Sequence, residues 1–175
     1  MVVPVLRSNS WNLAPSHVAQ IPVTLLESFV MIPVDYVETT STLHIAFGEG
    51  IDYSVLYAIA QMMGCHTETC MAVPSFVRKN LQSLSGHRGE SEVVFDRVAD
   101  AGEFSRIIHS YCVRLASPEI RLAGCGPFLW VRLLRSSRPP LDLLMRSSQA
   151  DSVRSVPPAV LPSLPLPAPA PSKET

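Results

Sequence analysis

The segment from Ile21 to Leu84 constrains the fold most strongly, because short apolar stretches alternate along it with clear helix and strand boundaries. Pro22–Ser28 has the apolar spacing of a short helix. Val30–Val37 and Thr42–Phe47 are rich in β-branched and apolar residues and predict a β-hairpin around a polar turn. Pro33 cannot donate a backbone hydrogen bond, so we expect the first strand at a sheet edge or with a bulge there.

A second helix and its neighbours complete this segment. Asp52 is a good N-cap residue, Gly64 suits the left-handed position after a helix, and apolar residues recur between them at helical spacing. His66–Val73 then predicts a half-buried strand, and Pro74–Leu84 predicts a closing helix. The expected fold class is α/β (α+β), with a small mixed sheet and short helices packed on it.

A second, smaller block of helix–strand–strand layout is expected over residues 92–134. Its main element is a helix from Ala101 to Ala116 with an apolar stripe, ended by Ser117-Pro118. Two strands follow, joined by a turn that contains two glycines and a proline. The strands are expected at Glu119–Ala123 and Phe128–Leu134, and an apolar start at Val93–Phe95 precedes the helix.

Residues 135–175 are expected to form a flexible tail rich in proline and serine. Seven of the chain's 16 prolines fall between Pro157 and Pro171, where they remove backbone donors and favour polyproline II over helix or sheet. The expected organisation is therefore one domain at residues 11–84, a small block at 92–134 and the tail, with a linker at residues 85–91.

Charge and hydropathy limit the classes of function. The 14 basic and 15 acidic residues nearly cancel, so the net charge of -1 gives no global attraction to nucleic acid or to anionic membranes. No apolar run reaches the roughly 18 residues of a membrane-spanning helix, and the first residues lack the basic start of a signal peptide. We therefore expect a soluble cytoplasmic chain with free thiols, no membrane insertion and no nucleic-acid partner.

Two groups of cysteine and histidine residues are candidates for chemistry, and each has a simpler structural interpretation. Cys65, His66 and Cys70 lack the spacing of a tetrahedral metal site, and buried thiols explain the cysteines. His109 and Cys112 lie three residues apart on one predicted helix, where their side chains can touch. Cys112 also belongs to the apolar stripe of that helix, so packing explains it without chemistry.

Arg121 and Arg132 fall on the two predicted strands of the second block. If they share one exposed face, they form either a patch for an anionic partner or, as we favour, a solvated sheet face. No catalytic motif and no phosphate-binding G-x-x-x-x-G-K-[ST] loop occurs in the chain. The sequence therefore predicts no catalytic, cofactor-binding or metal-binding residue, no cofactor and no enzymatic activity.

An ordered set of short strings runs through residues 11–84. They are Trp11-Asn12-Leu13, Ile21-Pro22 with Leu25-Leu26, Met31-Ile32-Pro33-Val34, Leu43-His44-Ile45-Ala46-Phe47, Asp52 with Leu56 and Ile59, and Val73-Pro74-Ser75. In this order they resemble the N-terminal (MshEN-type) domain of bacterial type II secretion and type IV pilus assembly ATPases. Residues 92–134 are similar in layout to the small subdomain that precedes the motor in those ATPases, with Glu119-Ile120-Arg121 and Val131-Arg132 at comparable places.

The resemblance implies a non-catalytic regulatory module that binds a protein component of the secretion or pilus machinery. The sequence lacks the motor domain, and it lacks the R-L-G…G…L…L…Q helical half that binds cyclic di-GMP in one branch of the family. Two alternatives stay open. One is a cyclic di-GMP-responsive sensor domain, and the other is a shortened product of a longer secretion-ATPase-like protein.

Overall fold

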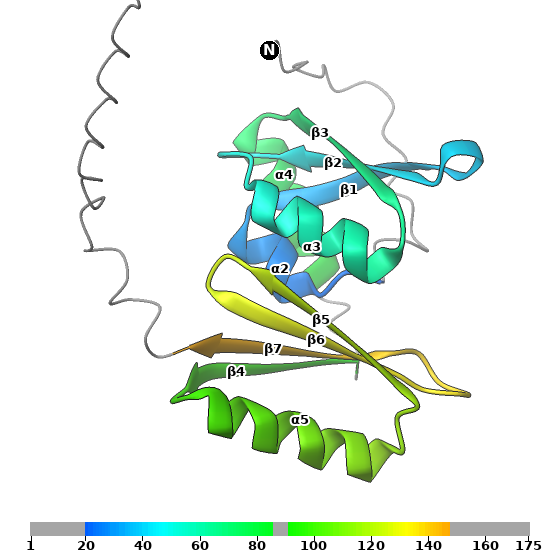
Figure 1. Cartoon of the computed structure of the whole chain (residues 1–175). Coiled ribbons are helices and arrows are strands. Elements are labelled where there is room, and N and C mark those ends of the chain that lie inside the picture. Colours follow the sequence, from blue (N-terminus) through cyan, green and yellow to red (C-terminus); the bar gives the residue numbers. More distant parts are fainter. Residues whose placement is uncertain (1–19, 86–90, 148–175) are drawn as a thin grey trace, which may run out of the picture.

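The computed structural model describes residues 20–85 and 91–147, which form two α+β halves (Figure 1). The first half contains a three-stranded sheet and the second a four-stranded sheet, and both sheets mix parallel with antiparallel pairs. The predicted α+β fold class is confirmed. The predicted features at Trp11–Leu13, at residues 86–90 of the linker and at Pro157–Pro171 lie outside the described residues.

The first sheet contains the predicted hairpin and one further strand. Its strands, in spatial order, are β1 (Met31–Val37), β2 (Thr42–Phe47) and β3 (His66–Met71). β1 and β2 are antiparallel and are joined by a short 3₁₀ turn, whereas β3 runs parallel to β2. β1 is an edge strand whose register shifts between Pro33 and Asp35, as expected from the missing proline donor.

Three helices complete the first half: α2 (Val23–Ser28), α3 (Tyr53–Met63) and α4 (Pro74–Ser85). α3 begins and ends as predicted. The Asp52 side chain accepts a hydrogen bond of 2.8 Å from the backbone N–H of Ser54, and Gly64 ends the helix at a φ of 66°. α3 connects the parallel strands β2 and β3, while α2 and α4 pack on each other and on β1.

The second half consists of β4 (Glu92–Val98), α5 (Ala101–Leu115), β5 (Glu119–Cys125), β6 (Phe128–Leu134) and β7 (Leu141–Ser147). The spatial order of the strands is β4-β7-β6-β5. α5, β5 and β6 confirm the predicted helix and hairpin. β4 and β5 are the two edges of this sheet, so α5 connects strands that have two others between them.

The prediction of a flexible tail from residue 135 is wrong for Leu141–Ser147, because these residues form β7 in the interior of the second sheet. β7 pairs in parallel with β4 and antiparallel with β6. The polar, proline-containing stretch Arg135–Pro140 marks only the loop before this strand, not the start of a tail. The second block is therefore strand–helix–strand–strand–strand rather than helix–strand–strand.

The two halves share one hydrophobic core. Leu25 and Ile59 of the first half belong to the same buried cluster as Cys125, Phe128 and Trp130 of the second. α3 lies against β5, and a separate cluster fills the space between the second sheet and α5. The second sheet is therefore the layer between the first half and α5 (Figure 1).

Candidate functional site

The four-stranded sheet presents its two faces to different parts of the chain. On β6, Phe128 and Trp130 face the first half, whereas Val131 and Leu133 face α5. This alternation follows from the two-residue period of a β-strand. Arg121 and Arg132, which the sequence singled out, lie on the first of these faces. An open apolar surface lies on the second.

α5 covers the sheet only as far as β6. Val131 and Leu133 are fully buried beneath it, but their neighbours across the strand pair, Leu122 and Ile120 of β5, are 49% and 41% exposed. A helix about 10 Å across spans about two interstrand distances of about 4.8 Å, which corresponds to three neighbouring strands. One helix is therefore too narrow for a sheet of this width, and the α5-side face of β5 is left uncovered.

The contacts of α5 show which of its sides borders β5. The rings of Tyr111 and of Phe95 on β4 meet edge to face with centroids 6.1 Å apart, so Tyr111 lies on the β4 side. Cys112 follows Tyr111 by about 100° around the helix, and in a right-handed β4–α5–β5 connection this rotation leads toward β5. Ile108 lies one turn before Cys112 on the same side.

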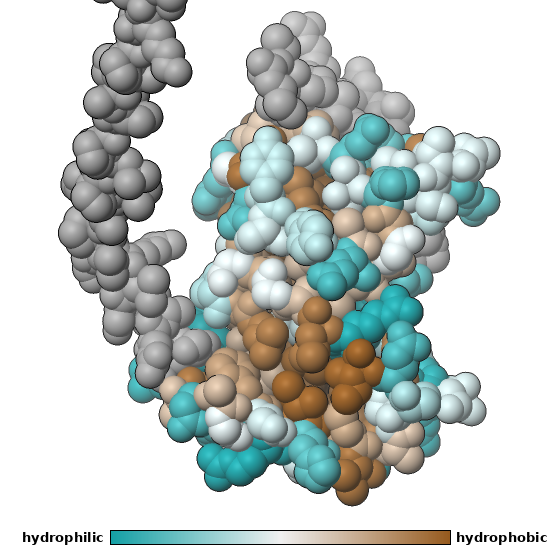
Figure 2. Space-filling view, in the orientation of Figure 1, coloured by the Kyte–Doolittle hydropathy of each residue, from teal (hydrophilic) through white to brown (hydrophobic). Residues whose placement is uncertain are grey.

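We call the resulting patch the β5 surface; its residues are Ile108, Cys112, Ile120, Leu122 and Leu129. It carries no charged side chain. Gly124 lies opposite Leu129, and a Cβ at this glycine would meet no atom within 4 Å, so the surface is open at that end. Figure 2 shows hydrophobic residues gathered on this side of the molecule, between the first half and α5.

The sequence did not reveal this surface. The alternation in β5 is typical of an ordinary half-buried strand and does not indicate whether its apolar side is covered. The number of elements in the second block could have indicated it, because one helix cannot cover every strand of a four-stranded sheet. The sequence predicted too few strands for this argument, since the residues of β7 were assigned to the tail.

Arg121 and Arg132 lie directly opposite each other on β5 and β6. Arg132 is only 4% exposed, and its guanidinium donates two hydrogen bonds of 2.8 Å to Asp142, from Nε to Oδ1 and from Nη2 to Oδ2. It also donates to the backbone oxygen of Gln20 and to the Met63 sulfur. The preferred expectation of a solvated sheet face is therefore wrong, because the first half covers this side.

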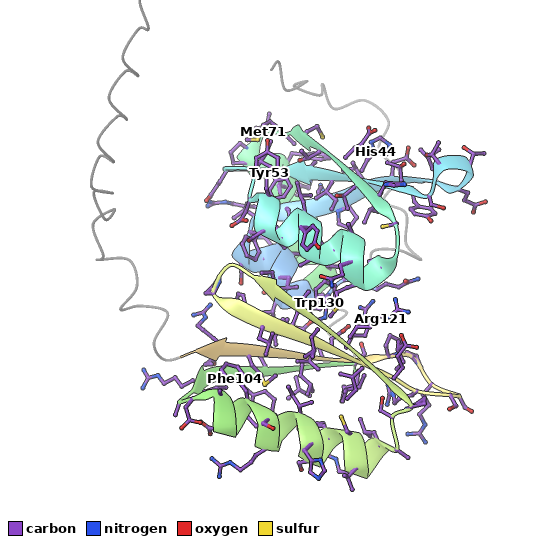
Figure 3. All side chains as sticks on the ribbon, viewed as in Figure 1. His44, Tyr53, Met71, Phe104, Arg121 and Trp130 are labelled. Carbon is purple, nitrogen blue, oxygen red and sulfur yellow. The ribbon has the colours of Figure 1, made fainter. Side chains whose placement is uncertain are left out.

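The two arginines line a cavity of about 520 Å³ at the junction between the halves. Figure 3 labels Arg121 and, on β6, the fully buried Trp130. Arg121 donates to Glu119 at 2.9 Å and to the backbone oxygen of Met62 at 3.2 Å. Each guanidinium therefore has its own carboxylate, Asp142 for Arg132 and Glu119 for Arg121. This arrangement gives no support to an anion site of the kind that cyclic di-GMP binding needs.

The cysteine and histidine candidates are not brought together into a site. Cys70 is buried on β3, whereas His66 at the start of this strand is exposed. Burial raises the pKa of the Cys65, Cys70 and Cys112 thiols. Burial, and secondly the Asp52 carboxylate, raise the pKa of Cys125 to about 12. All four thiols are therefore mostly protonated at neutral pH, which does not favour a nucleophilic role.

Metal ligands do not cluster in the part of the chain that the structure describes. Within residues 20–85 and 91–147, no group of three or more His, Cys, Asp or Glu side chains is placed to hold an ion. His109 is exposed on α5, while Cys112 packs against the cluster under that helix. Packing accounts for Cys112, in keeping with the simpler interpretation of this pair.

Comparison with protein-family models, with curated proteins and with solved structures gives no match to this chain. The resemblance to the secretion and pilus ATPases therefore stays a prediction. Among the described helices, none is both long enough and apolar enough to cross a bilayer.

Proposed function

We propose that the chain is a non-catalytic, cytoplasmic protein-interaction module that binds a component of a type II secretion or type IV pilus machinery. The observation that carries the proposal is the exposure of Ile120 and Leu122 on a strand whose inner neighbours are fully buried. Burying these side chains against a partner removes apolar area from water, at roughly 25 cal/mol per Å².

The chemistry of the β5 surface supports a protein partner over a small ligand. The surface is apolar and lies beside a helix on an open sheet face. An apolar core surrounded by polar residues is the common anatomy of a protein interface. The uncovered strand β5 lies at the sheet edge, so a partner segment can reach it beside α5.

The class of partner rests on the sequence resemblance. The order α2, β1, β2, α3, β3, α4 is the order of elements that the resemblance to the MshEN-type domain implies. In that family the module is attached to a motor, so the natural candidates for a partner are the motor and the inner-membrane components of the same machinery.

The test is direct binding between the purified chain and these purified components, using Leu122→Glu as the disrupting variant. A charge at position 122 cannot be buried in an apolar interface, so affinity should fall by about tenfold or more. Val113→Glu is the matched control, because Val113 is 68% exposed on α5 and lies outside the β5 surface. If no component binds the wild-type chain, or if both variants weaken binding equally, the proposal is wrong.

A further inference from the structure

The last described strand ends beside the β5 surface. Arg146 of β7 pairs with Phe128, the first residue after the β5–β6 hairpin turn. β5 and β7 both run antiparallel to β6, so their C-terminal ends lie at the same end of the sheet. Only β6 separates them, so the chain leaves β7 about 10 Å from β5.

The residues that follow β7 include a segment whose chemistry matches this surface. Val156–Pro171 is an unbroken run of valine, proline, alanine, leucine and serine without a charged residue. Its prolines lack backbone donors, so such a segment binds through side-chain contact with an apolar surface rather than as an added strand. The β5 surface also lacks charge, so neither partner would bury an unpaired ion.

We propose that Val156–Pro171 binds the β5 surface of its own chain and covers Cys112, Ile120, Leu122 and Leu129. The inference rests on the surface used in the proposed function, and it adds a regulation: an outside partner has to displace the segment. It does not depend on which partner that is.

The connection is long enough. The residues between Ser147 and Val156 reach about 26 Å or more when extended, which exceeds the roughly 10 Å that separates the end of β7 from β5. β5 has 7 residues and is about 23 Å long, so about seven or eight residues of the segment in polyproline II, at about 3.1 Å each, would follow its whole length. A tether this short gives a millimolar effective concentration, so even a weak contact is largely formed.

A second copy of the chain fits this surface less well. The outward side of α5 carries the exposed polar residues Arg106, His109 and Ser110 beside one large apolar side chain, Val113, so it offers little apolar area to fill the gap. Pairing through the free edge of β5 is hindered by α3, which lies against β5 on the other face of the sheet.

The experiment measures how fast N-ethylmaleimide alkylates Cys112 in the full-length chain, with each cysteine resolved by peptide mass spectrometry. The variant Leu161→Glu/Leu164→Glu places two charges in the docking segment, and Gln149→Glu/Ser152→Glu adds two charges outside it. Because the docked segment shields Cys112, the first variant should react about tenfold faster at Cys112, and the control should react like the wild type. Cys65, which is half-buried in the first half, serves as the internal reference and should not change.

A synthetic peptide of residues 156–171 should slow Cys112 alkylation again in the Leu161→Glu/Leu164→Glu variant. Equal Cys112 rates in all three chains would overturn the proposal. Protection that disappears when the chain is diluted would also overturn it, because a contact within one chain does not depend on concentration. These measurements need no outside partner, so their failure is distinct from a failure of the proposed function.

Discussion

Arg132 and Asp142 are direct neighbours on β6 and β7, and their side chains join through two hydrogen bonds of 2.8 Å inside the protein. Trp130 Nε1 donates to the same carboxylate at 2.8 Å. The pair connects the last described strand to the rest of the sheet and, through the backbone oxygen of Gln20, to the start of the first half. It therefore ties together segments that are far apart in sequence.

Removing one member of this pair should destabilise the fold strongly. Asp142→Ala leaves the buried Arg132 charge uncompensated, and we expect the free energy of unfolding to fall by about 3–5 kcal/mol. Urea unfolding measures this loss. Asp96→Ala, at an exposed position of β4, is the control and should change stability by less than about 0.5 kcal/mol. The double variant Arg132→Met/Asp142→Leu should be more stable than Asp142→Ala, and the opposite order would contradict the interpretation.

Two glycines of the β5–β6 hairpin should respond differently to alanine. Gly126 has a φ of 55°, and a Cβ there would lie 2.9 Å from Phe29 Cζ, so Gly126→Ala should cost about 1–3 kcal/mol. Gly124 has no neighbour within 4 Å of an added Cβ, so Gly124→Ala should be neutral or slightly stabilising. Thermal unfolding of the two variants gives the comparison. A loss for Gly126→Ala that is no larger than that for Gly124→Ala would contradict this interpretation.

The Glu92 carboxylate should contribute to the attachment of the two halves. It accepts hydrogen bonds from the backbone N–H groups of Val23 at 2.8 Å and Thr24 at 3.2 Å, at the start of α2. Glu92→Ala leaves these two donors without a protein acceptor, and we expect a loss of about 1–2 kcal/mol in chemical denaturation. Glu68→Ala is the matched control, because Glu68 is 69% exposed and its contact with His44 contributes little. A loss no larger than the control's would show that water replaces the carboxylate.

Stability should fall at alkaline pH because of Cys125. Burial raises the pKa of this thiol from an ordinary 9.0 to about 12, so the folded state favours the neutral form. The resulting stabilisation is complete below pH 9.0 and is lost progressively as the pH rises toward about 12, by at most about 1.4 kcal/mol per pH unit. Cys125→Ala should show a shallower loss over this window in urea titrations. Parallel curves for the two chains would exclude Cys125 as the cause.

Local sequence signals predicted the elements whose boundaries depend on single residues. Asp52 and Gly64 bound α3 because a carboxylate satisfies free N–H groups and glycine accepts a positive φ. Pro33 predicted the irregularity in β1 because its missing donor is a covalent property. β7 was missed because the proline-containing stretch before it resembles the sequence beyond it, and only the pairing with β4 and β6 distinguishes the two.

By itself, the sequence determined the kinds of element, most of their bounds and the absence of catalytic motifs, because capping, periodicity and missing donors act within a few residues. Only the tertiary structure decided whether each face of a strand is covered by another element or exposed to solvent. It buried Arg132 beside Asp142 and left Leu122 exposed, although both lie on strands with similar alternation. The physical reason is that burial depends on which elements happen to cover a face, and one helix beside a sheet of four strands leaves β5 open.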